Sequence, residues 1–401
     1  MDVFLFDAVR TPRGKGRPGG SLAAIPPVEL VVQLVAALEA RLGAEAVRAC
    51  GHFALGCVTE VGVQGGHIAL TSRIRAGLPE TLPCQTLNNF CVSGLSAIAQ
   101  SARRIALGEV GLAMAGGVES MSQVEFLADG ADYYSDMRLA RSLGWAPVGL
   151  AADLMAAREG IERAALDAVT LRSHHRARAA WAAGRFEASV IPVHSLDGTV
   201  ALGADENVRD LGDGSGLATM RLAFDGVGAA GFDEIILEQR PELGGLPHVH
   251  TLAHCPPIAD GAGLVLLGSA EAGQAAGLRP VARILAMAET ADDHVLQLTA
   301  GFSALEQALS RAKLSLSDMG AIEFMEAFAA TIAKFDRDYG ADPDRVNVNG
   351  GHLAMGHPMG ASGAILAGTL LDAMRRLDAE LGVVAATGGV GVGAAMVLER
   401  V

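Results

Sequence analysis

The second half of the chain repeats a pattern found in the first half. From Phe90 the sequence reads FCVSGLSAIAQSARRIAL and then GLAMAGGVESM, while from Met359 it reads MGASGAILAGTLLDAMRRL and then VVAATGGVGVG. Each stretch has a Ser-Gly pair, a helix-forming run of small residues, and a strand-forming run that ends in Gly-Gly-Val. Two copies of this length predict two similar α/β halves, because a solenoid needs a longer series of repeats.

Short apolar runs alternate with longer helical patterns elsewhere in the chain. The pattern predicts strands at Val3–Phe6, Phe53–Val58 and Gly111–Ala115, and helices at Val28–Leu42 and Leu95–Leu107. This alternation is typical of an α/β fold with largely buried sheets. Half of the residues are hydrophobic and only 19% are charged, which excludes a disordered chain.

The formal net charge of −14 excludes a general nucleic-acid binder, because the phosphate backbone would be repelled. The stretch 138–185 is locally basic, with eight arginines against four acidic residues. These arginines form either a solvated helical face or a patch for a phosphorylated ligand. The early segment RTPRGKGRPGG is interpreted as a basic loop, since it lacks the full phosphate-loop pattern.

The five cysteines are odd in number and include no Cys-x-x-Cys pair, which predicts a reducing, cytoplasmic environment. The first residues do not follow the order of a signal peptide. No apolar run is long enough to span a membrane, so we expect no membrane association.

Two residues in the repeated stretches are candidates for catalysis. Cys91 precedes a helix start, where free N–H groups lower the pKa of a thiol and favour a nucleophile. The alternative is a small buried residue, as most free cysteines are. His357 lies in NGGHLAMGHPMGASG, a stiff loop that could present a base, although a hydrogen-bonded loop histidine is the alternative. If the halves are related by a pseudo-two-fold axis, the two helix starts meet and pair Cys91 with His357.

Two further motifs carry weaker signals. The glycine run Thr387–Gly393 partly matches a dinucleotide-binding loop, but too little chain follows it, so exposed N–H groups of an oxyanion hole fit better. The segment HVHTLAHC contains His248 and His250, which would share one face of a strand as a metal pair. Ordinary loop histidines are the commoner explanation, and we expect no metal site.

Taken together, these segments resemble the thiolase family over nearly the whole chain. NNFCVSG resembles its nucleophile motif, FMEAFAA its EAFA motif, GHPMGASG its histidine motif, and TGGVGVG its C-terminal glycine loop. The segments DAVRTPRGK, GGVESMS, DENVRD, LATMRLAFD and ADGAG also occur in thiolase order.

The resemblance implies the five-layer αβαβα thiolase fold. Its two similar halves would be residues 1–121, completed by about 256–280, and residues 281–401. An inserted loop domain at 122–255 would bind coenzyme A. The resemblance also implies a homodimer or homotetramer, a coenzyme A thioester as substrate, no covalently bound cofactor, and a place in fatty acid or ketoacyl metabolism.

The resemblance assigns a role to each matching residue. Cys91 would accept the acyl group, His357 would activate it, and the N–H groups of Cys91 and Gly389 would form one oxyanion hole. The positions near coenzyme A or substrate are Arg221, Ala253, Pro256, Pro257 and Phe328. The locally basic insert would attract the phosphates.

Several positions depart from the family pattern. Thr387 stands where thiolases have a second cysteine, and Met325 where they usually have Asn or His before Glu-Ala-Phe. A threonine hydroxyl is no general base near neutral pH, so carbon–carbon bond chemistry is expected to be slow while acylation of Cys91 is retained. His352 is a candidate replacement base, although an ordinary loop histidine is the commoner reading. Pro256 replaces a common serine, and Asp225–His250 resembles an insertion.

The favoured function is therefore a thiolase-like acyl-CoA acyltransferase that works through an acyl-Cys91 intermediate. Two alternatives stay open at this point. One is a diverged acyltransferase or thioesterase that passes the acyl group to water or another nucleophile. The other is a non-catalytic homologue that binds acyl-CoA or a partner protein.

Overall fold

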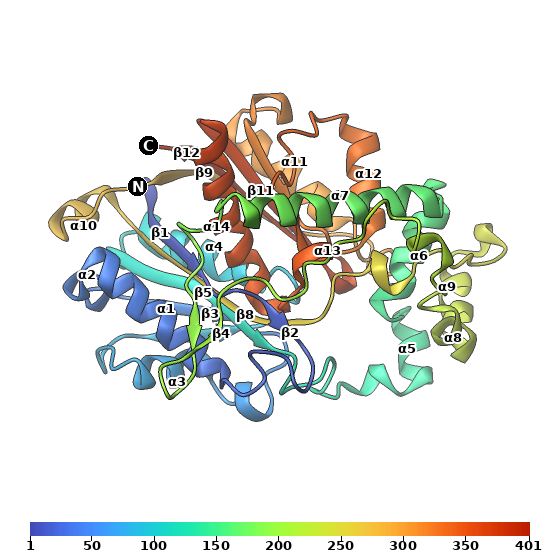
Figure 1. The fold of residues 1–401 in the computed structure, drawn as a ribbon, viewed down its shortest axis with the longest axis horizontal. Helices are drawn as coiled ribbons and strands as arrows, with labels where there is room; N and C mark the ends of the chain where they lie inside the picture. Colours follow the sequence, from blue (N-terminus) through green and yellow to red (C-terminus); the bar gives the residue numbers. More distant parts are fainter.

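The computed structural model describes residues 1–401 and has a ten-stranded mixed sheet at its centre (Figure 1). Five strands of the first half lie in the order β1-β8-β5-β3-β4. Strands β3 and β5 are parallel, whereas β8 runs antiparallel to both β5 and β1. Their bounds are β1 (Val3–Arg10), β3 (Phe53–Gly56), β4 (Cys84–Leu87), β5 (Leu112–Ser120) and β8 (Ala259–Gly268).

Four strands of the second half repeat this arrangement in the order β9-β12-β11-β10. Strands β10 and β11 are parallel, and β12 runs antiparallel to β11 and β9, as their counterparts do in the first half. Strand β9 also pairs with β1 and so joins the halves into one sheet. The predicted duplication is confirmed. The bounds are β9 (Ala282–Ala291), β10 (Ala321–Phe324), β11 (Leu381–Gly388) and β12 (Val392–Arg400), with a short β2 (Gly14–Lys15) beside β8.

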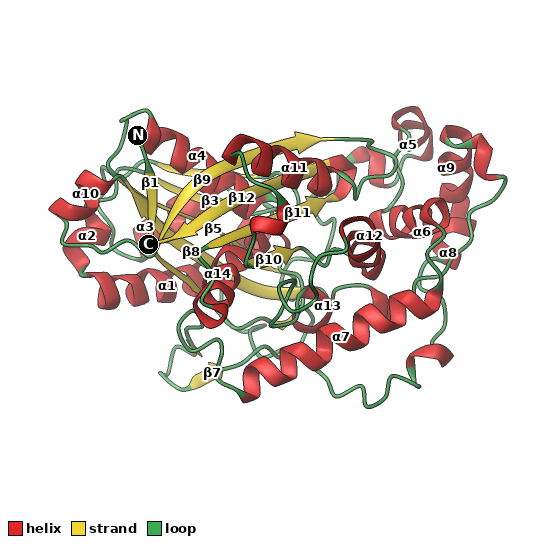
Figure 2. Ribbon diagram, turned by 90° about the horizontal axis from the view of Figure 1, so that it is seen from above, coloured by secondary structure: helices red, strands yellow, loops and turns green.

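Helices α4 (Ser93–Ala106) and α14 (Met359–Leu377) form the middle layer between the two parts of the sheet. Helix α14 contacts α4, β5, β8 and β1 on one side and β10 and β11 on the other. Helix α1 (Pro27–Leu42) covers the outer face of the first half, and α11 (Ala300–Ala312) covers that of the second (Figure 2). This order of layers is the expected αβαβα arrangement.

Small residues explain how the two central helices come so close. A Cβ atom added at Gly94 would lie 3.2 Å from the backbone N of Gly363, and one added at Gly363 would lie 2.3 Å from the N of Leu95. These glycines belong to the two Ser-Gly pairs of the repeat. The predicted meeting of the two helix starts is therefore present in the fold.

Most predicted elements are present with shifted ends. The first predicted strand extends to Arg10, and the strand predicted at Gly111–Ala115 extends through Gly116 and Gly117 to Ser120. An added Cβ atom at Gly116 would lie 1.9 Å from the carbonyl oxygen of Gly263 in β8, so this pair of strands needs glycine there. Conversely, the strand from Phe53 stops at Gly56.

The chain between β5 and β8 carries five helices, of which all but the long α7 lie beside the sheet on the right in Figure 1, while α7 extends from there across the middle of the view. They are α5 (Met137–Leu143), α6 (Val148–Glu159), α7 (Arg163–Ala182), α8 (Asp225–Val227) and α9 (Asp233–Gln239), with the separate strand pair β6 (Val193–His194) and β7 (Val200–Leu202). The remaining helices are α2 (Ala44–Arg48), α3 (Ile68–Arg75), α10 (Ala270–Ala275), α12 (Ala329–Tyr339) and α13 (His352–Met355). None of the helices is both long enough and apolar enough to cross a membrane.

Candidate active site

A cavity of about 850 Å³ brings both catalytic candidates together. Cys91 precedes α4, and His357 lies in the loop between α13 and α14. Gly389, which follows β11, lines the same cavity. The cavity therefore collects residues from the repeated segments of both halves, while residues between β5 and β8 supply much of its remaining wall.

Cys91 lies in a strained turn between β4 and α4. Phe90, the residue before it, has a φ of 47°, a backbone conformation that residues other than glycine rarely adopt. Burial raises the pKa of the Cys91 thiol to about 11, and hydrogen bonds to the backbone N–H groups of Gly389 and Cys91 itself lower it less. The expectation that the helix start gives Cys91 a low thiol pKa is therefore wrong. Burial raises this pKa by more than the N–H groups lower it.

The hydrogen bonds of His357 define which ring nitrogen is free. Its Nδ1 lies 2.7 Å from the Oγ of Ser362, and that hydroxyl donates to the carbonyl of Pro358 at 3.1 Å. With the single hydroxyl proton directed at the Pro358 carbonyl, Nδ1 carries its own proton and donates it to Ser362. Nε2 is then the unprotonated nitrogen, and it is shielded from solvent without a hydrogen-bond partner. Burial, followed by the charge of Arg13, lowers the pKa of His357 to about 3, so the imidazole is neutral.

The loop after β11 presents its backbone to the thiol. Val390 has a φ of 54°, and its N–H donates to the Oε1 of Gln297 at 3.0 Å. The Nε2 of Gln297 is in turn bound to the carbonyl of Ala146 at 2.8 Å. This anchoring holds the turn that carries Gly389, whose N–H lowers the pKa of the Cys91 thiol. Two strained residues, Phe90 and Val390, thus flank the nucleophile from opposite halves.

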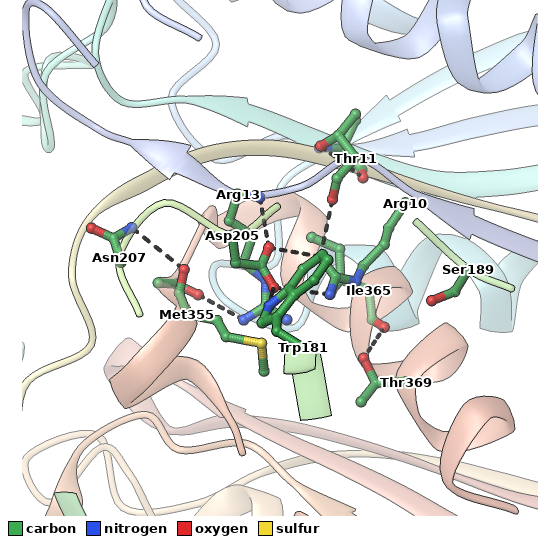
Figure 3. A network of polar contacts seen from close by, with 12 residues as sticks. Arg10, Thr11, Arg13, Trp181, Ser189, Asp205, Asn207, Met355, Ile365 and Thr369 are labelled. Carbon is green, nitrogen blue, oxygen red and sulfur yellow. Dashed lines mark hydrogen bonds and ion pairs between the residues drawn. The ribbon is translucent and has the colours of Figure 1, made fainter. Parts of the chain in front are cut away.

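A buried ionic network supports the loop that carries His357 (Figure 3). The Nη1 of Arg13 donates to the carbonyl of Gly356 at 3.0 Å. The carboxylate of Asp205 accepts the backbone N–H of Arg13 at 2.8 Å and both terminal nitrogens of Arg10 at 2.8 and 3.0 Å. These three side chains are almost completely buried. The sequence indicated only a basic loop here, because the paired aspartate lies far away in the chain.

Two buried carboxylates hold the same region, and sequence reasoning gave neither a role. Glu119, in β5, accepts the N–H of Gly360 at 2.9 Å and that of Val58 at 2.9 Å. Glu326 accepts the N–H of Leu353 at 2.9 Å and the hydroxyl of Ser173 at 2.7 Å. Their positions within GGVESM and MEAFA were the available signal.

Thr387 and Met325, the two catalytic positions that depart from the family pattern, do not line the cavity, and neither does His352. Thr387 is fully buried in β11, and its hydroxyl has no hydrogen-bond partner. Met325 is fully buried as well, while Ala327 and Phe328 of the same segment do line the cavity. His352 is fully buried and does not line the cavity. Neither of its ring nitrogens has a hydrogen-bond partner, and its ring centroid lies 5.1 Å from that of His357.

Four of the five positions expected near substrate line the cavity, namely Ala253, Pro256, Pro257 and Phe328. Arg221 is exposed and outside the lining, although Met220 before it belongs to the wall. Three basic residues that were not predicted also line it, Lys15, Arg17 and Arg209. The cluster of basic residues near the N-terminus was the signal for the first two.

The arginines between residues 138 and 185 do not contribute to the cavity. Arg172 and Arg178 form ion pairs with Asp336 and Asp210, and Arg176 donates to backbone carbonyls. These contacts favour the first interpretation, in which the arginines form a solvated helical face with largely structural contacts, over a patch that binds a phosphorylated ligand.

The segment with three histidines is not a strand, so the predicted shared face does not exist. His248 and His250 both bind Asp153, at 2.8 and 2.7 Å, and His254 binds Asp167 at 2.7 Å. These contacts place the imidazoles in hydrogen bonds that fix the loop. No group of three or more His, Cys, Asp or Glu side chains in the chain is arranged to hold a metal ion.

Comparisons with known proteins agree over the full length. Family models described as "Thiolase, N-terminal domain" and "Thiolase, C-terminal domain" match residues 3–232 and 278–400. The chain is 34% identical over 407 residues to a 3-ketoacyl-CoA thiolase of Escherichia fergusonii, covering 100% of this chain and 99% of that protein. A 3-ketoacyl-CoA thiolase of Klebsiella pneumoniae is 33% identical over the same shares.

A solved structure supports the same relationship. The crystal structure of human mitochondrial 3-ketoacyl-CoA thiolase superposes with a TM-score of 0.87 at 27% sequence identity. The match covers 100% of this chain and 98% of the human one.

Proposed function

Because this chain belongs to the thiolase family of acyltransferases, we propose that it transfers acyl groups of coenzyme A thioesters through an acyl-Cys91 intermediate. One observation carries the proposal. Cys91 lines one cavity with Gly389 and with His357, whose buried Nε2 has no hydrogen-bond partner.

In the first step, Nε2 of His357 takes the proton from the Cys91 thiol. The thiolate attacks the thioester carbonyl, a carbon–sulfur bond to Cys91 forms, and the bond to coenzyme A breaks. The coenzyme A sulfur leaves with the proton from His357. The N–H groups of Cys91 and Gly389 stabilise the negative oxygen of the tetrahedral intermediate, which is the usual role of such donors.

The thiol and the imidazole are both neutral before substrate binds, because burial disfavours their charged forms. The proton therefore moves only as the thioester is attacked. Ser362 keeps the imidazole in the tautomer that accepts it, and Arg13 fixes the backbone carbonyl just before the ring. A static arrangement of this kind limits reorganisation during the step.

The second step releases the acyl group to an acceptor. With coenzyme A as acceptor, the reverse of the first step forms a new thioester. When the substrate is a 3-oxoacyl-CoA, acylation itself breaks a carbon–carbon bond: Cys91 attacks the 3-oxo carbonyl, the bond between C2 and C3 breaks, and C2 of the departing acetyl-CoA must receive a proton. Thr387 supplies no thiol for this transfer, so we expect slow thiolysis and condensation.

Coenzyme A itself would bind along the basic and proline-bearing wall. Lys15, Arg17 and Arg209 carry positive charge that suits its phosphates. Ala253, Pro256 and Pro257 offer an apolar surface for the pantetheine arm. Arg221 stays a predicted contact at the rim, next to Met220.

We propose that the working form is the homodimer or homotetramer expected from the sequence. Strand β4 ends the sheet and has one edge free of other strands of this chain. Such an edge is a place where a second copy can add strands. Light scattering at several protein concentrations tests the assembly.

Intact-mass analysis after short incubation with acyl-CoA tests the function. An adduct of one acyl group should form in the wild-type chain and disappear in Cys91→Ala, whereas Cys84→Ala, a matched control outside the cavity, should keep it. Products are then measured with and without free coenzyme A. Transfer to coenzyme A supports the acyltransferase, and release as free acid supports the thioesterase alternative, for which the threonine at position 387 is the favouring observation. Acyl-CoA bound without an adduct would leave only the non-catalytic alternative.

A further inference from the structure

The cavity is unusually rich in aromatic rings for this chain. The sequence has only 12 phenylalanines, 3 tyrosines and 2 tryptophans, yet seven of these residues line the cavity. Two of the three tyrosines and one of the two tryptophans are among them. The concentration of rings at one place therefore requires an explanation beyond overall composition.

Three of the rings form one wall of the cavity that Cys91 lines. The ring centroid of Trp145 lies 5.2 Å from that of Tyr133 and 5.4 Å from that of Tyr134. These side chains pack with Val390, the residue that follows Gly389. We call Tyr133, Tyr134 and Trp145 the aromatic wall. Through Val390 the wall adjoins the loop that carries Gly389, and it lines the same cavity as Cys91, where the acyl group of a bound thioester would begin.

The wall is supported from behind and is therefore stiff. Trp145 packs edge-to-face against Phe232 at 5.8 Å, and the Tyr134 hydroxyl donates to Asp129 at 3.1 Å. Trp145 is only 8% exposed, and this side chain lines the cavity. A preformed flat surface favours another ring, which it contacts by its face or edge at little cost in conformational entropy.

Two further rings line the same cavity. Phe224 and Phe328 pack edge-to-face with centroids 6.2 Å apart. The Phe224 ring lies over Gly149, where an added Cβ atom would lie 2.2 Å from it, so the chain leaves out a side chain to admit the ring. An acetyl group, with two carbon atoms, would leave most of this aromatic surface in contact with water.

We propose that the acyl group carried by Cys91 bears a bulky hydrocarbon ring, aromatic or alicyclic, that packs against the aromatic wall. The inference rests on the proposed function, since it names the substrate class of the same site. The ring would replace water on apolar surface, which favours binding in proportion to the area covered. A cavity of about 850 Å³ lies in the range that holds drug-sized ligands.

Three coenzyme A thioesters test the proposal by their rates of Cys91 acylation, followed by intact mass at low thioester concentration. They are 3-phenylpropanoyl-CoA, nonanoyl-CoA with the same number of acyl carbons in a linear chain, and acetyl-CoA. The ring-bearing thioester should acylate Cys91 about tenfold faster than acetyl-CoA, and also faster than nonanoyl-CoA, since a filled apolar pocket discriminates by about this factor or more.

Trp145→Ala should reduce the ratio of the phenylpropanoyl rate to the nonanoyl rate by several-fold, and Trp145→Phe should restore part of it. Leu143→Ala, an exposed position on α5 outside the cavity, should keep the wild-type ratio. If Trp145→Ala loses its near-ultraviolet circular dichroism, Tyr133→Ala takes its place. Equal rates for the three thioesters, or a ratio that these wall variants leave unchanged, would overturn the inference while acylation of Cys91 upholds the proposed function. Acylation of Cys91 by none of them would overturn both.

Discussion

Arg13 holds the carbonyl of Gly356, one residue before His357, through a hydrogen bond of 3.0 Å in a region closed to solvent. The same guanidinium lowers the pKa of His357 by its charge, second only to burial. One arginine thus fixes both the position of the base and its protonation.

Arg13→Met should therefore change the pH dependence of acylation as well as stability. Without the positive charge the pKa of His357 rises, so the imidazole becomes protonated at a higher pH. The acidic limb of the rate profile therefore moves to higher pH. The unpaired carbonyl of Gly356 costs about 1–3 kcal/mol of stability. Single-turnover acylation measured against pH, with Arg41→Met as the exposed control, tests this; an acidic limb that stays in place would contradict the role of Arg13.

His357→Gln should slow acylation by about 10²–10⁴-fold, because it removes the base. It should also flatten the dependence of stability on pH. The native imidazole has its pKa lowered to about 3, so below the ordinary value of 6.5 the unfolded chain binds a proton that the native protein excludes. Stability from this group is complete above pH 6.5 and is lost as the pH falls toward 3. Urea unfolding of both proteins at neutral and acidic pH measures how much free energy of unfolding each loses as the pH falls. The wild type and His357→Gln should lose the same amount if the imidazole is not buried and neutral.

The thiol of Cys91 should be slow to alkylate at neutral pH. Since its pKa is raised to about 11, the thiolate fraction grows about tenfold for each pH unit until that value is approached. Iodoacetamide labelling of native protein, read for the Cys91 peptide by mass spectrometry, should follow this slope. The same peptide in denaturant should level off near the ordinary thiol pKa of about 8.5. A plateau near neutral pH in the native protein would indicate a preformed thiolate instead.

Gly388→Ala should slow acylation with little loss of stability. Gly388 has an extended backbone with a φ of −143°, which alanine accepts. However, the added Cβ atom would lie 3.2 Å from the N and 3.3 Å from the Cβ of Cys91. Gly216→Ala, which meets no atom within 4 Å, is the matched control. Equal acylation rates for the two variants would show that Cys91 tolerates this displacement.

Thr387 allows two substitutions with different expected results. Thr387→Val removes a buried hydroxyl that lacks a partner and should raise the free energy of unfolding by about 1 kcal/mol. Residue 387 does not line the cavity, but it precedes Gly388, where an added Cβ atom would lie 3.3 Å from the Cβ of Cys91. Because this position is close to the nucleophile, Thr387→Cys should instead raise thiolysis of a 3-oxoacyl-CoA, with a further gain when Met325→Asn is added. Thermal unfolding and a coupled thiolysis assay separate the two. Wild-type thiolysis as fast as that of the double variant would show that the threonine is no handicap.

The repeat was enough to predict two similar α/β halves and the pairing of Cys91 with His357, because helix and strand periods follow from local patterns. The order of the five layers came from the resemblance to thiolases. Three features depend on contacts between distant parts of the chain and could not be predicted. Asp205 pairs with Arg10 across 195 positions, the burial of Cys91 outweighs its helix start, and the aromatic wall comes from the chain between β5 and β8. Even Thr387, identified from its sequence position, was expected in the cavity wall and lies outside it.

The contact between Gly94 and Gly363 sets how far apart the two chemical partners stand. Thiol and imidazole are carried by separate halves, and each is followed within a few residues by one of these glycines. A methyl group on either would act as a spacer and push the two helices apart. The distance between the base and the nucleophile thus depends on two residues that have no side chain. Replacing either glycine with alanine, away from any reacting atom, can therefore separate His357 from Cys91.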